Sequence, residues 1–73
     1  MEKLTTTLEV IINRYENEVE KGAKLLEIIE VMMPLAKIDK EFKIMADVTK
    51  GLLKRDKETL EFLYEKKKLL EEL

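Results

Sequence analysis

The side chains that could do chemistry in this 73-residue chain are carboxylates, lysines, two arginines and two tyrosines. The chain has no His, no Cys and no Ser. General acid–base catalysis usually recruits His, and nucleophilic catalysis usually recruits Ser or Cys. We therefore predict that the protein is not an enzyme and that it takes no cofactor.

Carboxylates recur along the first half of the chain, where Glu16 and Glu20, or Glu27 and Glu30, could project together from a helix. Di-iron bundles combine such glutamates with a Glu-x-x-His motif, and a chain without His cannot supply it. Calcium and magnesium sites prefer clustered Asp and Asn around a glycine turn, which is also missing. The sequence therefore predicts no metal site, and we expect these carboxylates to bridge to neighbouring lysines such as Lys24.

A stripe of lysines follows one side of the second half of the chain, opposite its apolar face. Its members are Lys37, Lys40, Lys43, Lys50, Lys54 and Lys57. Such a stripe could contact phosphates or an acidic partner, with Lys43, Lys50 and Lys54 as the candidate contacts. However, Asp47 interrupts it, and a net charge of -2 with a pI near 5.2 argues against general nucleic-acid binding. A nucleic-acid accessory role is the alternative function, and a solvated helix face is the favoured reading.

Two long amphipathic helices must position these side chains. Thr6 and Glu9 match a capping box ahead of an apolar run, which predicts a helix over about 7–32. The apolar positions of that run recur at three- and four-residue steps, as one helix face requires. They are Leu8, Ile11, Ile12, Tyr15, Val19, Gly22, Ala23, Leu26, Ile29 and Met33.

The only proline, Pro34, ends that helix and predicts a turn over about 33–38. A second helix is expected over about 39–72. Asp39 would then be its N-cap, and the alternative is that the helix begins earlier, at Pro34. Its predicted apolar face is Leu35, Ile38, Phe42, Met45, Leu52, Leu53, Leu60, Leu63, Tyr64 and Leu70. Asp56 falls in the middle of this face, where it could pair with Asn13 or Arg14 across the hairpin, or cap a third helix if the chain breaks near 54–57. The favoured fold is all-α, a single domain over 1–73 built as an antiparallel helical hairpin.

A second apolar line runs along both predicted helices, although a simple hairpin needs only one. It predicts a protein interface formed by Leu25, Ile28, Met32, Met33, Ile44, Val48, Phe62, Leu69 and Leu73. If the turn centres near Pro34, residues 69–73 also outrun the first helix and need cover from another chain. We therefore expect a homo-oligomer, with a dimeric four-helix bundle of the coiled-coil kind as first choice. A third helix of the same chain, or a different protein partner, could also cover the line.

The composition completes the sequence-level picture. No apolar run approaches the roughly 20 residues of a membrane span, so a cytoplasmic protein without membrane contact is expected. Lys and Glu dominate the charged residues, a bias typical of hyperthermophile proteins. The predicted function is a non-enzymatic protein-interaction or assembly module, such as an adaptor, a small inhibitor or a structural subunit.

Overall fold

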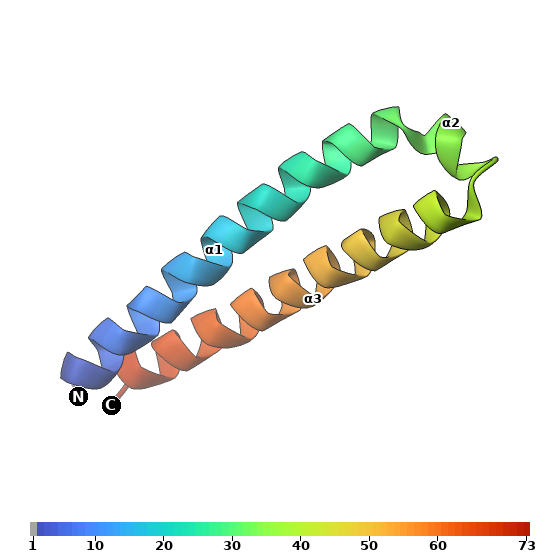
Figure 1. Ribbon diagram of the computed structural model, residues 1–73. Coiled ribbons are helices and arrows are strands. Elements are labelled where there is room, and N and C mark those ends of the chain that lie inside the picture. Colours follow the sequence, from blue (N-terminus) through green and yellow to red (C-terminus); the bar gives the residue numbers. More distant parts are fainter. Residues whose placement is uncertain (1) are drawn as a thin grey trace.

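The computed structural model describes residues 2–73 and consists of two long helices folded back on each other (Figure 1). Helix α1 spans Glu2–Val31, the short α2 spans Met33–Ala36, and α3 spans Lys40–Glu71. The molecule is a rod of 54 × 14 × 14 Å with both termini at one end. The predicted all-α helical hairpin is therefore confirmed.

The two long helices meet along a single seam. The less exposed positions of α1 alternate at steps of three and four residues, and those of α3 do the same. In α1 they include Leu8, Ile12, Tyr15, Val19, Gly22, Leu26 and Ile29, and in α3 they include Phe42, Ala46, Thr49, Leu53, Asp56, Leu60, Leu63, Lys67 and Leu70. This is heptad spacing, which keeps a seam of two apolar positions per heptad facing the partner helix.

Small residues let the helices approach closely in the half of the seam nearer the turn. An added Cβ at Gly22 would meet Leu53 Cδ1 at 3.0 Å, so the glycine makes room for that leucine. Ala46 is fully buried, and the Thr49 hydroxyl donates to the Met45 carbonyl oxygen at 3.0 Å. Within residues 2–73 the thin seam leaves five buried apolar side chains: Ile12, Ile29, Ala36, Ala46 and Leu53.

The apolar face predicted for the second helix was partly wrong. Ala46 and Thr49 occupy the seam, whereas Met45 and Leu52 remain 42% and 55% exposed. Ile38, which lies in the turn, is 84% exposed. The prediction favoured large side chains, but the close approach of the helices selects small ones at these heights.

The turn contains one more helical element than the sequence predicted. Residues 33–36, which belong to the predicted turn, form α2 with Pro34 in its first turn, where a missing N–H costs little. The backbone then adopts an extended conformation at Asp39. The Oδ1 atom of this residue accepts hydrogen bonds from the backbone N–H of Glu41 at 3.0 Å and of Phe42 at 3.4 Å. The predicted N-cap of the second helix is thus present.

Both ends of the hairpin differ from the predicted boundaries. Helix α1 begins at Glu2 instead of residue 7, so Thr6 lies inside the helix and the predicted capping box does not form. The expectation that residues 69–73 lack a partner in their own hairpin was also wrong for Leu69 and Leu70. These two residues line one groove together with Leu4 and Leu8, because the earlier helix start supplies a partner.

The α3 helix is continuous through 54–57, where a break had been the alternative. Its apolar spacing keeps the same phase on both sides of this segment. The three-helix bundle is therefore excluded for this chain.

Replacing Asp39 by Ala should destabilise the hairpin by about 1 kcal/mol, because two N–H groups at the start of α3 lose their acceptor. Asp39→Ser keeps a capping oxygen and should restore most of this loss. Urea unfolding followed by circular dichroism, at one fixed protein concentration, measures both. Equal stability of the Ala variant and the wild type would contradict the cap's role.

Replacing Gly22 by Leu should destabilise the hairpin by about 1–3 kcal/mol, because the side chain must displace Leu53 from the seam. Gly51 is the matched control, since an added Cβ there meets no atom within 4 Å. Gly51→Leu should leave stability unchanged or raise it by up to about 1 kcal/mol through helix propensity. If both leucine variants unfold at the same urea concentration, the close approach at Gly22 is not a packing constraint.

Candidate functional site

One flank of the seam is apolar over most of its length, and we call it the apolar face. It comprises Leu4, Ile11, Leu25, Ile28, Met32, Met45, Val48, Leu52, Phe62 and Leu69, all 41–64% exposed. Two surface grooves show that α1 and α3 contribute to the same flank. Leu25 and Leu52 line one groove, and Leu4, Ile11 and Leu69 line the other. The remaining members follow these residues at heptad spacing along their helices.

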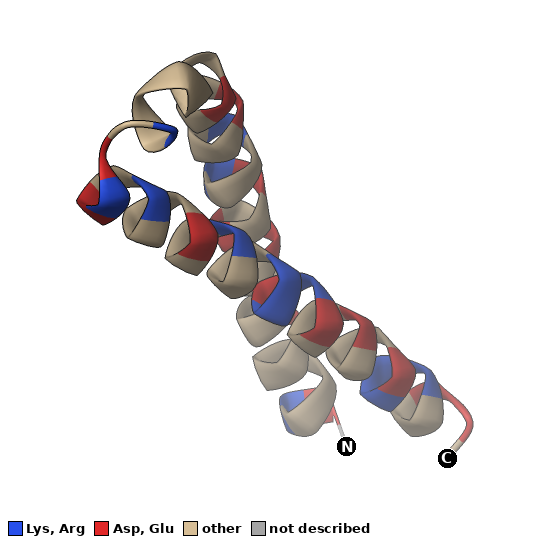
Figure 2. Ribbon diagram, turned by 90° about the vertical axis from the view of Figure 1, so that its right-hand side faces the viewer, with Lys and Arg blue, Asp and Glu red and all other residues tan. Residues whose placement is uncertain are grey.

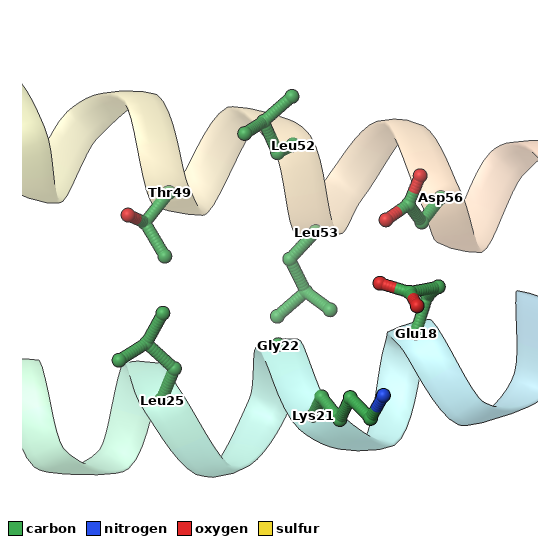
Figure 3. Close-up of a pocket in the computed structure, with 8 residues that line it drawn as sticks. All are labelled: Glu18, Lys21, Gly22, Leu25, Thr49, Leu52, Leu53 and Asp56. Carbon is green, nitrogen blue, oxygen red and sulfur yellow. The ribbon is translucent and has the colours of Figure 1, made fainter.

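A belt of charge, which we call the charged belt, crosses this face at mid-height. It comprises Arg14, Glu18, Lys21, Arg55 and Asp56. In the groove beside Leu53, the carboxylates of Glu18 and Asp56 point toward each other across the seam (Figure 3). The predicted pairing of Asp56 with Asn13 or Arg14 is not made, although Arg14 and half-buried Asp56 line a common pocket. Within residues 2–73 neither belt carboxylate has an ion pair.

The structure brings most of the predicted interface residues onto the apolar face. Leu25, Ile28, Met32, Val48, Phe62 and Leu69 lie there, and Leu73 follows directly after α3 with 83% exposure. Met33 is half-buried in α2, at the end of the seam. Ile44 lies seven residues before Gly51, which faces open space, so its position is on the outer side of α3.

Four members of the apolar face were missed as interface residues: Leu4, Ile11, Met45 and Leu52. Ile11, Met45 and Leu52 had been assigned to the hairpin's own core, and Leu4 to the segment before the first helix. The signal that could have found Leu4 and Ile11 is strict heptad spacing, because they occupy the same heptad position as Leu25 and Met32. Lys66 also lies on this flank, and its Nζ is 4.9 Å from the centre of the Phe62 ring.

The opposite flank of the seam is polar. The Tyr64 hydroxyl donates to Glu16 Oε2 at 2.5 Å, and Lys67 Nζ lies 3.8 Å from Glu9 Oε1. Heptad steps from Tyr64 place Lys43, Lys50 and Lys57 on this flank, with Lys54 further out, and steps from Glu16 place Glu30 there on α1. The lysine stripe therefore shares its flank with glutamates, and Figure 2 shows acidic and basic residues interleaved along the ribbons.

The hydrogen bond to Glu16 raises the pKa of Tyr64 above its ordinary value of 10.0, and desolvation and the nearby negative charge act in the same direction. A raised pKa means that the neutral tyrosine is favoured in the folded state. Its contribution to stability is complete below pH 10 and is lost as the pH rises through the raised pKa.

The surface ion pairing expected of the carboxylates is present for Glu20, whose Oε1 lies 3.2 Å from Lys24 Nζ. Within residues 2–73 there is no group of three acidic side chains placed to hold a metal ion. In that same range, neither long helix is apolar enough to cross a membrane. No protein-family model matches the chain, and no curated protein or solved structure matches it.

Replacing Glu16 by Ala should lower the pKa of Tyr64 toward its ordinary value, because the acceptor and its negative charge are both removed. Ultraviolet titration in a Tyr15→Phe background isolates Tyr64, since these are the only two tyrosines. Glu20→Ala is the control, because Glu20 pairs with Lys24 and should leave the titration unchanged. If the pKa of Tyr64 is the same in the Glu16→Ala variant, the result contradicts the hydrogen bond between the two side chains.

Proposed function

We propose that this chain is a non-enzymatic helical assembly module that works through its apolar face. The proposal rests on the large area of surface that the hairpin leaves exposed to solvent. The hairpin exposes 6031 Å², whereas a compact monomer of 8.6 kDa exposes roughly 4,700 Å². The ten large apolar side chains of the apolar face, each 41–64% exposed, gather on one flank, a pattern typical of interaction sites.

The size of the apolar face supports stable association. Its ten side chains are each about half exposed, so together they offer on the order of 1,000 Å², against ~800 Å² per partner in a standard interface. Burying the exposed half of one such side chain contributes about 1 kcal/mol. The apolar faces of two copies together would therefore contribute about 20 kcal/mol, which exceeds an association cost of ~4–15 kcal/mol.

Self-association is the form of assembly that we favour, giving a dimeric four-helix bundle of coiled-coil type. A bundle of this kind supplies each amphipathic helix with a second neighbour, which the exposed residues of the apolar face need. A different helical protein could occupy the same face. The cytoplasmic location and the thermophilic source stay predictions from composition.

A nucleic-acid accessory role is the weaker candidate. It would use Lys43, Lys50 and Lys54, but the same flank carries Glu16 and Glu30 on α1. These carboxylates reduce the attraction for phosphates that a row of lysines would exert alone. The apolar face, in contrast, has uninterrupted stretches on both sides of the charged belt.

The test of the proposed function is sedimentation equilibrium at micromolar concentration. The wild type should report at least twice 8.6 kDa. Val48→Glu should shift the population toward the monomer, because an unpaired charge in an apolar interface is costly. Val10→Glu is the matched control: Val10 is also exposed, at 64%, but lies off the apolar face.

Circular dichroism should show that both variants remain helical. A wild-type chain that stays monomeric would overturn self-association. Equal weakening by the two substitutions would show that the apolar face is not the contact surface.

A further inference from the structure

We infer that the occupant of the apolar face is a second copy related by a two-fold axis along the hairpin's length, so that both turns lie at the same end of the dimer. In this arrangement α1 of each copy packs on α3 of the other. The inference rests on the proposed function, because it specifies how the self-associating face is used. It follows from which residues share a height along the rod.

The contact between Gly22 and Leu53 fixes the heights within one chain. Because the helices are antiparallel, each step toward the N-terminus of α1 matches one step toward the C-terminus of α3. Leu25 therefore shares a height with Leu52, and the carboxylate of Glu18 is level with residues 55–59 of α3.

A two-fold axis along the rod keeps these heights and exchanges the helices. Ile28 of one copy then faces the partner's Val48, and Leu25 faces the partner's Leu52. Toward the termini, Leu4 faces the partner's Leu69. Apolar side chains meet apolar side chains on both sides of the charged belt, as an isologous interface requires.

The charged belt decides between the two possible axes. With the axis along the rod, Glu18 meets the partner's Arg55, and Lys21 lies between the partner's Asp56 and Arg55, so each of the two belt carboxylates gains a cationic neighbour. With the axis across the rod, α1 would pack on the partner's α1 and Glu18 would face the partner's Glu18. Like charges brought together at an interface are disfavoured, so the lengthwise axis is the complementary one.

The inferred dimer also accounts for two carboxylates of the charged belt that lack an ion pair in the single chain. Glu18 and Asp56 face each other across the seam and have no ion pair within residues 2–73 (Figure 3). In the dimer the partner's Arg55 and Lys21 lie close enough in height to pair with these two carboxylates. A second copy therefore offers Glu18 and Asp56 the ion-pair partners that they lack in one hairpin.

Distances between spin labels on single-cysteine variants test the arrangement directly, because the chain has no cysteine of its own. Ile38→Cys places a label at the turn, where the side chain is 84% exposed and lies off the apolar face. The lengthwise axis predicts a label separation of about 25 Å, the width of two stacked helices. The crosswise axis predicts a separation comparable to the 54 Å length of the rod.

A label at Asn17→Cys, near mid-height, is the matched control. Both axes predict a short distance there, so this label reports dimer formation alone. No dipolar signal at either position would overturn self-association itself. A short distance at residue 17 with a long one at residue 38 would leave the proposed function standing and overturn only the arrangement.

A charge exchange gives an independent readout. Glu18→Arg should weaken the dimer roughly tenfold, because the arginine then faces the partner's Arg55. Adding Arg55→Glu should recover most of that loss, since the pair is restored with its signs exchanged. Under the crosswise axis, Glu18→Gln would instead strengthen the dimer by relieving repulsion. Stronger dimerisation of Glu18→Gln, or no recovery in the double variant, would overturn the inference.

Discussion

The structure depends on one geometric limit: two antiparallel helices share a single seam, and that seam holds few side chains. Helices α1 and α3 are each long enough to present eight or nine positions to it. Among residues 2–73, the buried apolar side chains of these two helices are Ile12, Ile29, Ala46 and Leu53, with exposures of 0–7%. A chain of this size stays marginal with such a core unless a further partner supports it. The apolar face is the consequence, because the apolar residues that the seam cannot hold remain on the surface.

Small side chains in the seam reduce the volume of the hairpin's own core further. Gly22 and Ala46 bring the helices close together, which fixes the register but removes volume that larger residues would fill. Met45 and Leu52 are displaced to the flank of the seam and join Leu25 there. The same packing choice therefore narrows the hairpin's own core and enlarges the surface available to another helix pair.

The two flanks of the seam differ in whether their polar side chains pair across the seam. On the polar flank, Tyr64 and Lys67 reach across to Glu16 and Glu9 and tie the helices together within one chain. On the apolar flank, the cross-seam neighbours Glu18 and Asp56 have the same charge. One flank is thus satisfied by its own chain, while the other is the surface that we propose a second copy covers.

Sequence patterns were enough to predict the two helices, the turn at Pro34 and the Asp39 cap, because each follows from local chemistry. They did not predict that Ala46 and Thr49 would lie in the seam, since that choice depends on how closely α1 approaches. They also misplaced Leu69 and Leu70, because the true start of α1 at Glu2 leaves no local capping signal. For the apolar face, spacing alone placed Phe62 and Leu25 together, whereas Leu52 could be assigned to it only once the register was known.

The most direct test of the central claim is the solvent exposure of methyl groups, measured by NMR with a soluble paramagnetic agent at high protein concentration. The claim predicts that the Leu25, Ile28 and Leu52 methyls are protected like those of Leu53 in the seam, while Val10 and Val31 on the outer side of α1 are bleached. Dilution should expose the first group and leave the second unchanged. Equal bleaching of Leu52 and Val10 at high concentration would contradict the claim that the apolar face is a contact surface.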